Sequence, residues 1–355
     1  MARVLVLGAG KIGATVAAML AGAGDDQVVL GDVDRAILEA RAPAGMATLV
    51  VDADDPFALR SALAGQDVVV AALPFFLDVR VAEAARAERV HYFDLTEDVA
   101  TRRRIERLAE GAGSVFIPQC GLAPGFVAIA AMALVDRFDE VLDVRLRVGA
   151  LPKFPDNALK YNLTWSTDGL INEYCNACEA IVDGRPMEVL PLEGVEEFSL
   201  DGVVYEAFST SGGVGTLCET LAGRVRNLDY KTVRYPGHRA AARMLAHDLK
   251  LCRRRDLFRD VIEHAVPVTS QDVVLVFVTV VGRRKGLLTQ ETWTRKVYGD
   301  GSEDGLSAIQ KTTAAGLCAM IDLHRQGRLP EAGFVRQEQA RLDDMLDNRF
   351  GRVFG

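Results

Sequence analysis

The feature that most constrains this chain is a short apolar stretch that runs directly into a glycine-rich motif. Residues 4–7 are continuously apolar, and residues 8–13 read Gly-Ala-Gly-Lys-Ile-Gly, ahead of an alanine-rich stretch over residues 14–20. A second apolar run, residues 28–30, leads to Asp32, roughly 20 residues beyond the glycines, as this fingerprint requires. The order of strand, glycines, helix, strand and acid predicts a dinucleotide-binding fold.

Each position of the motif has a physical role. Gly8 permits the tight turn after the strand, Gly10 lets backbone approach a pyrophosphate, and Gly13 lets helix and strand pack closely. Lys11 and Ile12 lie between these glycines, and the helix that follows offers free N–H groups and a positive dipole end that favour phosphate. We therefore predict that all five residues contribute to cofactor binding.

Asp32 bears on which dinucleotide binds. A carboxylate at this position can accept hydrogen bonds from both hydroxyls of the adenosine ribose, and it repels a 2′-phosphate. This favours NAD as the cofactor over NADP. Arg35 lies close in sequence and leaves room for a phosphate partner.

The alternation of strand and helix continues and predicts an α/β fold built on a Rossmann domain. The apolar composition of the strands is continuous, which is typical of a parallel sheet covered on both faces. We expect its six strands at residues 4–7, 28–30, 47–51, 67–73, 91–95 and 114–118.

Ligands on such sheets lie beyond the carboxyl ends of the strands. This rule adds Asp52, Pro74, Cys120 and Gly121 to the predicted cofactor-binding residues, because each follows an expected strand. For Asp52, contact with the adenine ring and capping of the next helix are equally consistent with the sequence.

The pattern changes after residue 122. Later segments alternate polar and apolar residues and are rich in β-branched and aromatic side chains, which predicts a second, α+β domain with a mixed or antiparallel sheet. We expect a Rossmann domain over residues 1–122, a substrate-binding and dimerisation domain over 123–306, and C-terminal helices over 307–355 that return to the Rossmann domain. Helices of the later chain are expected at residues 170–176, 215–223, 236–251 and 307–326.

Composition limits the possible partners. The net charge of -8 argues against nucleic acid, and the longest apolar stretch, residues 273–281, is too short to cross a membrane. Two basic runs, residues 102–104 and 253–255, are interpreted as solvated helix faces. Because the first strand begins at residue 3, no signal peptide is expected, and we predict a cytoplasmic protein.

The six cysteines are scattered along the chain. Cys175 and Cys178 have the spacing of metal ligands, but no second Cys or His pair accompanies them. We therefore expect no metal site and a set of reduced thiols, as is usual in the cytosol.

Longer strings of the sequence resemble the saccharopine dehydrogenase superfamily and, within it, the L-lysine 6-dehydrogenases. The resemblance covers nearly the whole chain and is carried by the opening GAGKIG motif and by more specific strings. These strings are YFDLTED at residues 92–98, CGLAPG at 120–125, and the segments 156–181, 209–217, 227–238 and 308–316.

The resemblance implies NAD-dependent oxidation of L-lysine at its ε-amine, giving the 6-semialdehyde and ammonia. It also implies that the second domain binds the small amino-acid substrate and forms a homodimer. One position departs from saccharopine-forming relatives, which tend to carry an arginine where Asp168 follows Trp165-Ser-Thr. An aspartate there could attract an ammonium group, or it could cap a helix.

The implied chemistry requires a base that removes a proton from the ammonium before hydride leaves the carbon, and a cation for the α-carboxylate. Capping, core packing or a plain turn is the alternative for each candidate. The predicted catalytic residues are Asp94, Glu97 and His238. The predicted substrate-binding residues are Trp165, Asp168, Arg224, Arg234 and Gly212.

Two other functions remain open from the sequence. One is a condensing dehydrogenase or reductase of the saccharopine or carboxynorspermidine type, which joins an amine to a carbonyl compound. The other is a non-catalytic dinucleotide-binding protein.

Overall fold

The computed structural model describes residues 1–302 and 305–355. The chain forms two compact units, which are described separately. The first unit comprises Met1–Phe126 together with Gln310–Gly355, and the second comprises Val127–Ile309. We expected the domain limits at residues 122 and 306.

The first unit contains a parallel sheet in the order β3-β2-β1-β4-β5-β6-β15. Its first six strands follow the order 3-2-1-4-5-6 of a Rossmann fold. The strands are β1 (Ala2–Leu7), β2 (Asp26–Asp32), β3 (Ala47–Val50), β4 (Val68–Ala71), β5 (His91–Asp94), β6 (Val115–Ile117) and β15 (Gly333–Phe334). We expected six strands here; β15, from the end of the chain, extends the sheet beyond β6.

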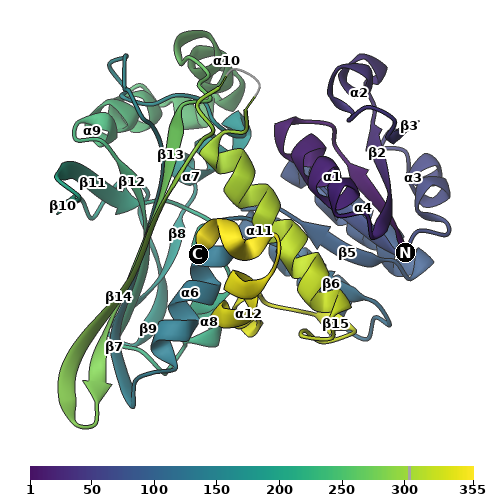
Figure 1. The fold of residues 1–355 in the computed structure, drawn as a ribbon. Coiled ribbons are helices and arrows are strands. Elements are labelled where there is room, and N and C mark those ends of the chain that lie inside the picture. The colour runs from purple at the N-terminus through teal and green to yellow at the C-terminus, as the bar shows by residue number, and fades with distance from the viewer. Residues whose placement is uncertain (303–304) are drawn as a thin grey trace. The chain divides into compact units, whose positions relative to one another are not determined.

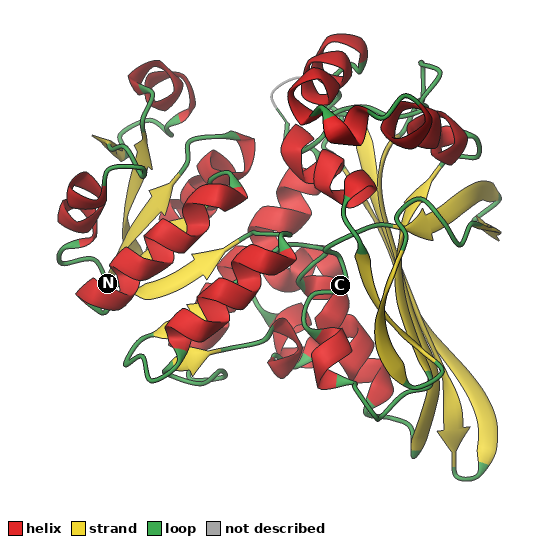
Figure 2. Cartoon of the chain, turned by 180° about the vertical axis from the view of Figure 1, so that it is seen from behind, coloured by secondary structure: helices red, strands yellow, loops and turns green. Residues whose placement is uncertain are grey.

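Helices lie on both faces of this sheet (Figures 1 and 2). Asp34, Asp55 and Asp98 begin three of them by accepting hydrogen bonds from backbone N–H groups of the first turn. The helices are α1 (Lys11–Ala23), α2 (Arg35–Arg41), α3 (Pro56–Leu63), α4 (Phe75–Glu88), α5 (Val99–Ala109), α11 (Ala308–Arg325) and α12 (Leu342–Asp347), with short 3₁₀ turns at Gln337–Gln339 and Gly351–Phe354.

One face of the sheet packs on α3, α4 and α5 through a continuous apolar core. Leu5, Val69 and Phe116 from the strands meet Leu63 and Ile105 from these helices. Burial of such side chains contributes about 1.5–3 kcal/mol each. This packing makes the sheet a rigid support for the loops at its carboxyl edge.

The second unit is built on a mixed sheet with the order β10-β11-β12-β7-β13-β14, and β8 and β9 attach beside β12. β12 runs parallel to β7, whereas the other pairings are antiparallel. The strands are β7 (Glu140–Pro152), β8 (Cys178–Val182), β9 (Arg185–Val189), β10 (Glu196–Leu200), β11 (Val203–Ser209), β12 (Asn227–Arg234), β13 (Asp272–Arg284) and β14 (Leu287–Tyr298). The Rossmann sheet and this mixed sheet confirm the predicted fold class.

Helices α7 (Thr167–Cys175), α9 (His238–Arg243) and α10 (Arg255–Ala265) gather at the end of this sheet that lies opposite the turn of the β13–β14 hairpin (Figure 1). They contribute to an apolar core that includes Ile171, Phe208, Phe258 and Ile262. The other helices are α6 (Phe126–Val135) and α8 (Leu217–Thr220), and the chain also forms a π-helical turn at Met244–Asp248 and a 3₁₀ turn, η2, at Leu251–Arg253.

Two helix predictions were wrong in the second unit. The single helix expected over residues 236–251 is divided into α9, the π-helical turn and η2, and α10 was not predicted. The basic run at 102–104 also differs from its interpretation as a solvated face, because Arg102 is buried and pairs with Glu106. No helix among the described residues is long and apolar enough to cross a membrane.

Candidate functional site

The glycine-rich loop at the end of β1 has the geometry of a phosphate-binding turn. Gly8 has φ of +99°, and a Cβ there would lie 2.3 Å from the carbonyl oxygen of Ala72. A Cβ at Gly13 would lie 1.8 Å from the carbonyl oxygen of Gly8. These two glycines are therefore required by the fold itself.

Gly10 has a different reason to be glycine. No atom of the described chain lies within 4 Å of the position that its Cβ would occupy. α1 begins directly after Gly10, without a side-chain cap or an acidic residue in its first turn. Space for backbone approach and free N–H donors thus occur together, which fits the pyrophosphate of a dinucleotide.

Asp32 is fixed beside this loop by two backbone hydrogen bonds. Its Oδ2 accepts from the N–H of Ala9 at 2.7 Å, and its Oδ1 accepts from the N–H of Asp34 at 2.9 Å. Each carboxylate oxygen keeps lone-pair capacity that a ribose hydroxyl can use. The position fits the predicted contact with an adenosine ribose.

Two cations lie close to the same loop. The guanidinium of Arg41 donates to the carbonyl oxygen of Ala9 at 3.4 Å. Burial and the nearby charge of Arg41 lower the pKa of Lys11. The positive charges of Lys11 and Arg41 offset the repulsion between Asp32 and a 2′-phosphate. The loop therefore combines a charge that favours NAD with charges that favour NADP.

The other predicted cofactor residues at this edge have structural roles as well. Asp52 is exposed and accepts from the N–H of Asp54 at 2.8 Å, in the turn before α3. Pro74 is the residue that precedes α4, and Ile12 lies in the first turn of α1. Contact with a cofactor remains a prediction for these residues.

Asp94 is a buried carboxylate whose oxygens are engaged by the protein. It has no solvent exposure and accepts from the hydroxyl of Tyr92 at 2.8 Å, the N–H of Thr96 at 2.9 Å and the N–H of Gln119 at 2.8 Å. Burial raises the pKa of Asp94 to about 6. These contacts connect the loops after β5 and β6, so Asp94 holds the carboxyl edge of the sheet together.

Glu97 differs from Asp94 because its side chain is partly exposed. Burial raises the pKa of the neighbouring carboxyl of Asp78, and the charges of Asp94 and Glu97 raise it further. The cap of α5 is Asp98, which accepts from the N–H of Thr101 at 2.7 Å, and neither Asp94 nor Glu97 takes that position. Of the two predicted carboxylates, Glu97 is thus the more accessible.

The Cys120–Gly121 turn is held by contacts within the first unit. The thiol of Cys120 is buried and accepts from the Nε2 of Gln337 at 3.2 Å, and burial raises its pKa well above the usual range. A Cβ at Gly125 would lie 2.1 Å from the carbonyl oxygen of Gly121, so this turn is closely packed. Any contact of Cys120 with a cofactor would involve its backbone.

A buried polar cluster lies in the second unit, around Arg234 at the end of β12. Arg234 is 2% exposed, and its guanidinium stacks 4.7 Å from the ring centre of Tyr161. Its Nη2 lies 3.6 Å from a carboxylate oxygen of Glu173, and its charge acts on the neighbouring Tyr174. We call Tyr161, Glu173, Tyr174, Arg234 and His238 the Arg234 cluster.

His238 completes this cluster as a neutral side chain. Its Nδ1 lies 2.7 Å from the carbonyl oxygen of Leu159, and its Nε2 lies 2.8 Å from the hydroxyl of Tyr174. Because a carbonyl can only accept, Nδ1 carries the proton and Nε2 accepts from Tyr174. Burial and the charge of Arg234 lower the pKa of His238 to about 3. His238 therefore orients Tyr174 and is not an exposed base.

Several buried polar atoms in this unit lack a hydrogen-bond partner among the described residues. They include Nε of Arg234, Oδ1 of Asn162 and Oγ1 of Thr210. Such groups carry a desolvation cost unless a bound molecule satisfies them. Asn162 adjoins Tyr161 in the chain, so these atoms fit a small polar ligand near the Arg234 cluster.

A glycine-containing loop packs beside the same cluster. The N–H of Ser211 donates to the carbonyl oxygen of Glu173 at 3.1 Å, and Gly212 has φ of +90°. A Cβ at Gly213 would lie 2.2 Å from the ring of Tyr230. The predicted substrate residue Gly212 thus lies in a loop that α7 and β12 hold in place.

Of the other predicted substrate residues, Trp165 contacts the Arg234 cluster, whereas Arg224 and Asp168 have other surroundings. Trp165 contacts the cluster, because its Nε1 donates to the hydroxyl of Tyr161 at 3.0 Å. Arg224 is exposed. Asp168 forms an ion pair with Arg259 of α10, with Nε to Oδ1 at 3.0 Å. We predicted that Asp168 attracts a substrate ammonium. In the structure, Arg259 already binds this carboxylate and would compete with the ammonium.

Sequence reasoning missed the polar roles of Tyr161, Tyr174, Asn162 and Thr210. The available signal was the concentration of tyrosine, asparagine and threonine in the specific strings at 156–181 and 209–217. Another cation of β12, Lys231, binds Glu196 at 2.8 Å.

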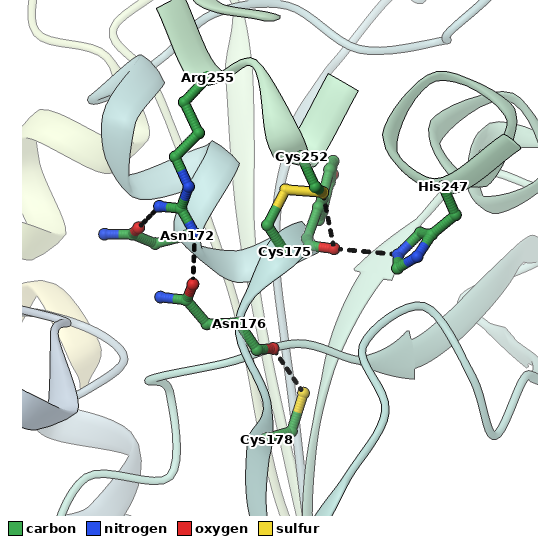
Figure 3. Close-up of a disulfide and its surroundings, with 8 residues drawn as sticks. Asn172, Cys175, Asn176, Cys178, His247, Cys252 and Arg255 are labelled. Atoms are coloured by element: carbon green, nitrogen blue, oxygen red, sulfur yellow. Dashed lines mark hydrogen bonds between the residues drawn. A yellow bond between two sulfur atoms is a disulfide. The ribbon is translucent and has the colours of Figure 1, made fainter. Parts of the chain in front are cut away.

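The prediction of six reduced cysteines was wrong for two of them. Cys175, at the end of α7, forms a disulfide with Cys252 of η2, 77 residues away in sequence (Figure 3). Their Cα atoms lie 5.5 Å apart. The other four cysteines are free and buried: Cys120, Cys178, Cys218 and Cys318.

Family models match most of the chain. Residues 4–114 match the saccharopine dehydrogenase NADP binding domain, and residues 121–350 match the saccharopine dehydrogenase C-terminal domain. Among curated proteins, the chain is 25% identical over 265 residues to the mitochondrial alpha-aminoadipic semialdehyde synthase of Bos taurus, covering 69% of this chain and 27% of that protein. It is 26% identical over 189 residues to saccharopine dehydrogenase [NADP(+), L-glutamate-forming] of Saccharomyces cerevisiae, covering 51% of this chain and 42% of that protein. The chain therefore spans less than half the length of these relatives.

Solved structures show the same fold at lower sequence identity. The apo saccharopine dehydrogenase (L-Glu forming) of Saccharomyces cerevisiae has a TM-score of 0.80 and 18% identity, with 100% of this chain and 96% of that chain covered. The homospermidine synthase of Legionella pneumophila, in complex with NAD, has a TM-score of 0.67 and 13% identity, with 99% and 89% covered.

Proposed function

The chain belongs to the saccharopine dehydrogenase family, and from this premise we propose that it is a nicotinamide-dependent dehydrogenase of a lysine-derived amino acid. Its first candidate reaction is oxidation of L-lysine at carbon 6 to the semialdehyde, with release of ammonia. The observation that carries the proposal is the buried Arg234, whose Nε lacks a partner among the described residues. A substrate α-carboxylate is the ligand that such a guanidinium binds most strongly.

Other cations of the second unit are paired with acidic side chains, which supports a substrate with one carboxylate. Arg147 is buried and ion-paired with Glu196 and Asp229, and Lys231 also binds Glu196. Saccharopine carries more carboxylates than lysine and needs more free cations. Arg147 and Lys231 are neutralised by carboxylates at hydrogen-bond distance, whereas Arg234 has Glu173 at 3.6 Å and an Nε without a partner among the described residues.

The residues of the first unit fit a nicotinamide dinucleotide, with the glycine-rich loop at its phosphates and Asp32 at its ribose. Such a dinucleotide, when bound, supplies the acceptor for hydride. The protein must bind and orient the amine and remove its extra proton. Because Asp94 and His238 are buried with their polar atoms engaged, we propose Glu97 as the proton acceptor.

Within the Arg234 cluster, proton positions are fixed by the hydrogen bonds. Tyr174 donates to His238, and His238 donates to the carbonyl of Leu159, while the charge of Arg234 acts on both side chains. This directional chain leaves the guanidinium charge permanent and keeps Tyr174 neutral. We propose that the cluster holds the carboxylate end of the substrate and takes no proton from it.

Saccharopine dehydrogenation is the second candidate, favoured by the similarity to saccharopine dehydrogenases of yeast. The deciding experiment incubates the protein with NAD and NADP and with L-lysine or saccharopine, while it follows reduced cofactor and ammonia. Lysine-dependent reduction with equal ammonia release supports the first candidate. Faster reduction with saccharopine would replace it by the second, and binding of a dinucleotide without turnover of either would favour a non-catalytic protein.

The cofactor prediction concerns Asp32. Replacing Asp32 with Ala is expected to shift the ratio of the dissociation constants for NADP and NAD toward NADP by about 10- to 150-fold, since a charged hydrogen bond contributes about 1.5–3 kcal/mol. Calorimetric titration of both cofactors measures this without turnover. Asp52→Ala, which changes an exposed acid after β3, is the matched control and should leave the ratio unchanged. Equal NAD and NADP affinity in the unmodified protein would show that Lys11 and Arg41 offset Asp32.

The proton-transfer prediction concerns Glu97. Glu97→Gln is expected to lower kcat by about 10²- to 10⁴-fold, the usual contribution of general base catalysis, while the dissociation constant for NAD stays the same. Steady-state kinetics and cofactor titration test both parts. Glu110→Gln, at the end of α5, is the control, because that side chain is exposed. Unchanged turnover in Glu97→Gln would exclude Glu97 as the base.

We further propose a homodimer in the cytoplasm, on the resemblance that places dimer contacts in the second domain. Exposed apolar side chains at the turn of the β13–β14 hairpin, Leu287 and Leu288, are consistent with a protein contact. Light scattering after gel filtration would contradict the dimer if it gave the mass of one chain.

A further inference from the structure

The Cys175–Cys252 disulfide lies at the edge of the Arg234 cluster. Cys175 is the last residue of α7 and directly follows Tyr174, whereas Cys252 belongs to η2. The bond therefore attaches the end of the helix that supplies Glu173 and Tyr174 to a segment that follows β12 and α9. Figure 3 shows the bond beside other contacts of the same helix end.

These other contacts are polar and weaker than a covalent bond. Arg255 donates to the side-chain oxygens of Asn172 at 2.6 Å and Asn176 at 2.5 Å (Figure 3). His247 donates from Nε2 to the carbonyl oxygen of Tyr174 at 3.3 Å. Partly buried or exposed hydrogen bonds of this kind open locally more easily than a covalent bond, so the disulfide is the covalent restraint on the last turn of α7, which also packs in the apolar core.

The disulfide is more accessible than the other cysteines of the chain. Cys175 and Cys252 are half-buried, whereas the four free cysteines are buried. Lys250, Arg253 and Arg254 surround Cys252 in sequence, and both arginines are exposed. Their positive charge stabilises a thiolate that leaves from Cys252. The basic run at 253–255 was interpreted as a solvated helix face. Its position next to Cys252 also favours the departure of the Cys252 thiolate.

Cys178 is not a competing nucleophile, although it has CxxC spacing with Cys175. Burial raises the pKa of Cys178 to about 12, with a further contribution from Glu173. Its thiol therefore stays protonated near neutral pH, and only a thiolate attacks a disulfide. Reduction must come from an external thiol.

We propose that Cys175–Cys252 is a reversible redox site through which a dithiol reductant controls the substrate affinity of the Arg234 cluster. One thiolate of the reductant attacks the Sγ of Cys175, the S–S bond breaks, and the Cys252 thiolate leaves. The second thiolate of the reductant then attacks its own sulfur in the mixed disulfide and releases Cys175. Two electrons pass to the protein, the reductant becomes a disulfide, and each cysteine thiolate takes one proton from solvent.

Reduction releases the end of α7 and with it the positions of Glu173 and Tyr174. The carboxylate anchor at Arg234 loses order, while the dinucleotide loop in the first unit is unaffected. The expected signature is a rise in KM for the amino acid of about fivefold or more, a typical coupling between sites, with an unchanged dissociation constant for the dinucleotide. This consequence rests on the proposed function, whereas the redox chemistry does not.

The experiment treats the native protein with dithiothreitol, blocks new thiols with an alkylating agent and maps them by mass spectrometry. Hydrogen exchange over residues 170–178, KM and cofactor affinity are measured in parallel. We expect labels at Cys175 and Cys252, faster exchange at the end of α7, and reversal of both after oxidation. Absence of new labels under native conditions, or unchanged exchange after reduction, would overturn the proposal.

The double variant Cys175→Ser/Cys252→Ser should reproduce the reduced state and no longer respond to dithiothreitol. Cys218→Ser, a buried cysteine of α8, is the matched control and should keep the full response. If the double variant does not fold, labelling and exchange of the wild-type protein still decide the outcome. If neither lysine nor saccharopine is oxidised, the proposed function fails, and the thiol labels and exchange rates still test the redox site.

Discussion

Replacing Arg234 with lysine is expected to lower kcat/KM for the amino-acid substrate by about 10- to 150-fold, equivalent to about 1.5–3 kcal/mol for a hydrogen bond between charged groups. Lysine keeps a positive charge near Glu173 but lacks the planar fork with which arginine binds a carboxylate while it also contacts Tyr174. The dissociation constant for NAD should not change. Steady-state kinetics and calorimetric cofactor titration measure the two quantities.

Arg224→Lys is the matched control for this experiment. Arg224 was the other predicted carboxylate partner, and the structure leaves it exposed. An exposed ion pair contributes about 0–1 kcal/mol, so this variant should retain nearly full activity. A loss of activity in Arg224→Lys together with normal kinetics in Arg234→Lys would move the carboxylate site to Arg224. Circular dichroism of both variants separates this outcome from misfolding.

The contrast between these two arginines shows where sequence reasoning reached its limit. Both precede or end the same strand, β12, and either could bind a carboxylate by its chemistry. Only the packing of Tyr161 over the guanidinium, and the approach of Glu173 from α7, distinguish Arg234. These contacts join segments far apart in the chain, and no local spacing encodes them.

The parallel sheet was predictable because its determinants are local. Each strand is a short apolar run, and the glycines after β1 satisfy steric limits set by their immediate neighbours. β15 was not predictable in the same way, because two residues, Gly333 and Phe334, carry no periodic pattern. They become a strand by pairing with Val115 and Phe116.

Asp94 and the disulfide show that contacts between distant segments also decide which chemical role a residue can have. The sequence places Asp94 at the carboxyl end of a strand, and in the structure it is the last residue of β5. Its burial depends on another loop, in which the N–H of Gln119 donates to one of its carboxylate oxygens. The pairing of Cys175 with Cys252 depends on α10, which was not predicted, because that helix positions the preceding turn against α7. The place of a residue along a strand could therefore be predicted from the sequence, whereas its solvent accessibility and its interaction partners could not.

Acidification is expected to destabilise the second unit through His238. In the folded protein, burial and Arg234 lower the pKa of His238 to about 3, whereas an unfolded histidine has a pKa near 6.5. Between these values the unfolded chain binds a proton that the folded chain does not bind, so the free energy of unfolding falls as the pH decreases. From pH 7 to pH 4 this single group should remove about 3 kcal/mol, and the loss approaches its limit only near pH 3.

The measurement compares urea unfolding of the wild-type protein and His238→Gln at several pH values. Both tryptophans of the chain, Trp165 and Trp293, belong to the second unit, so their fluorescence reports its unfolding. Glutamine can accept from Tyr174 and donate to the carbonyl of Leu159 without titrating, and its pH dependence should therefore be smaller by about 3 kcal/mol over this range.

His264→Gln is the control for this comparison, because His264 is exposed on α10 and should have the same pH dependence as the wild type. Asp94 acts in the opposite direction in the first unit: its pKa of about 6 exceeds that of an unfolded aspartate, so protonation of the folded state offsets part of any global acid effect. The difference between variants cancels that contribution. If His238→Gln and wild type lost stability equally on acidification, His238 would be able to bind a proton in the folded state, and the order of donors from Tyr174 through His238 to the carbonyl of Leu159 would be wrong.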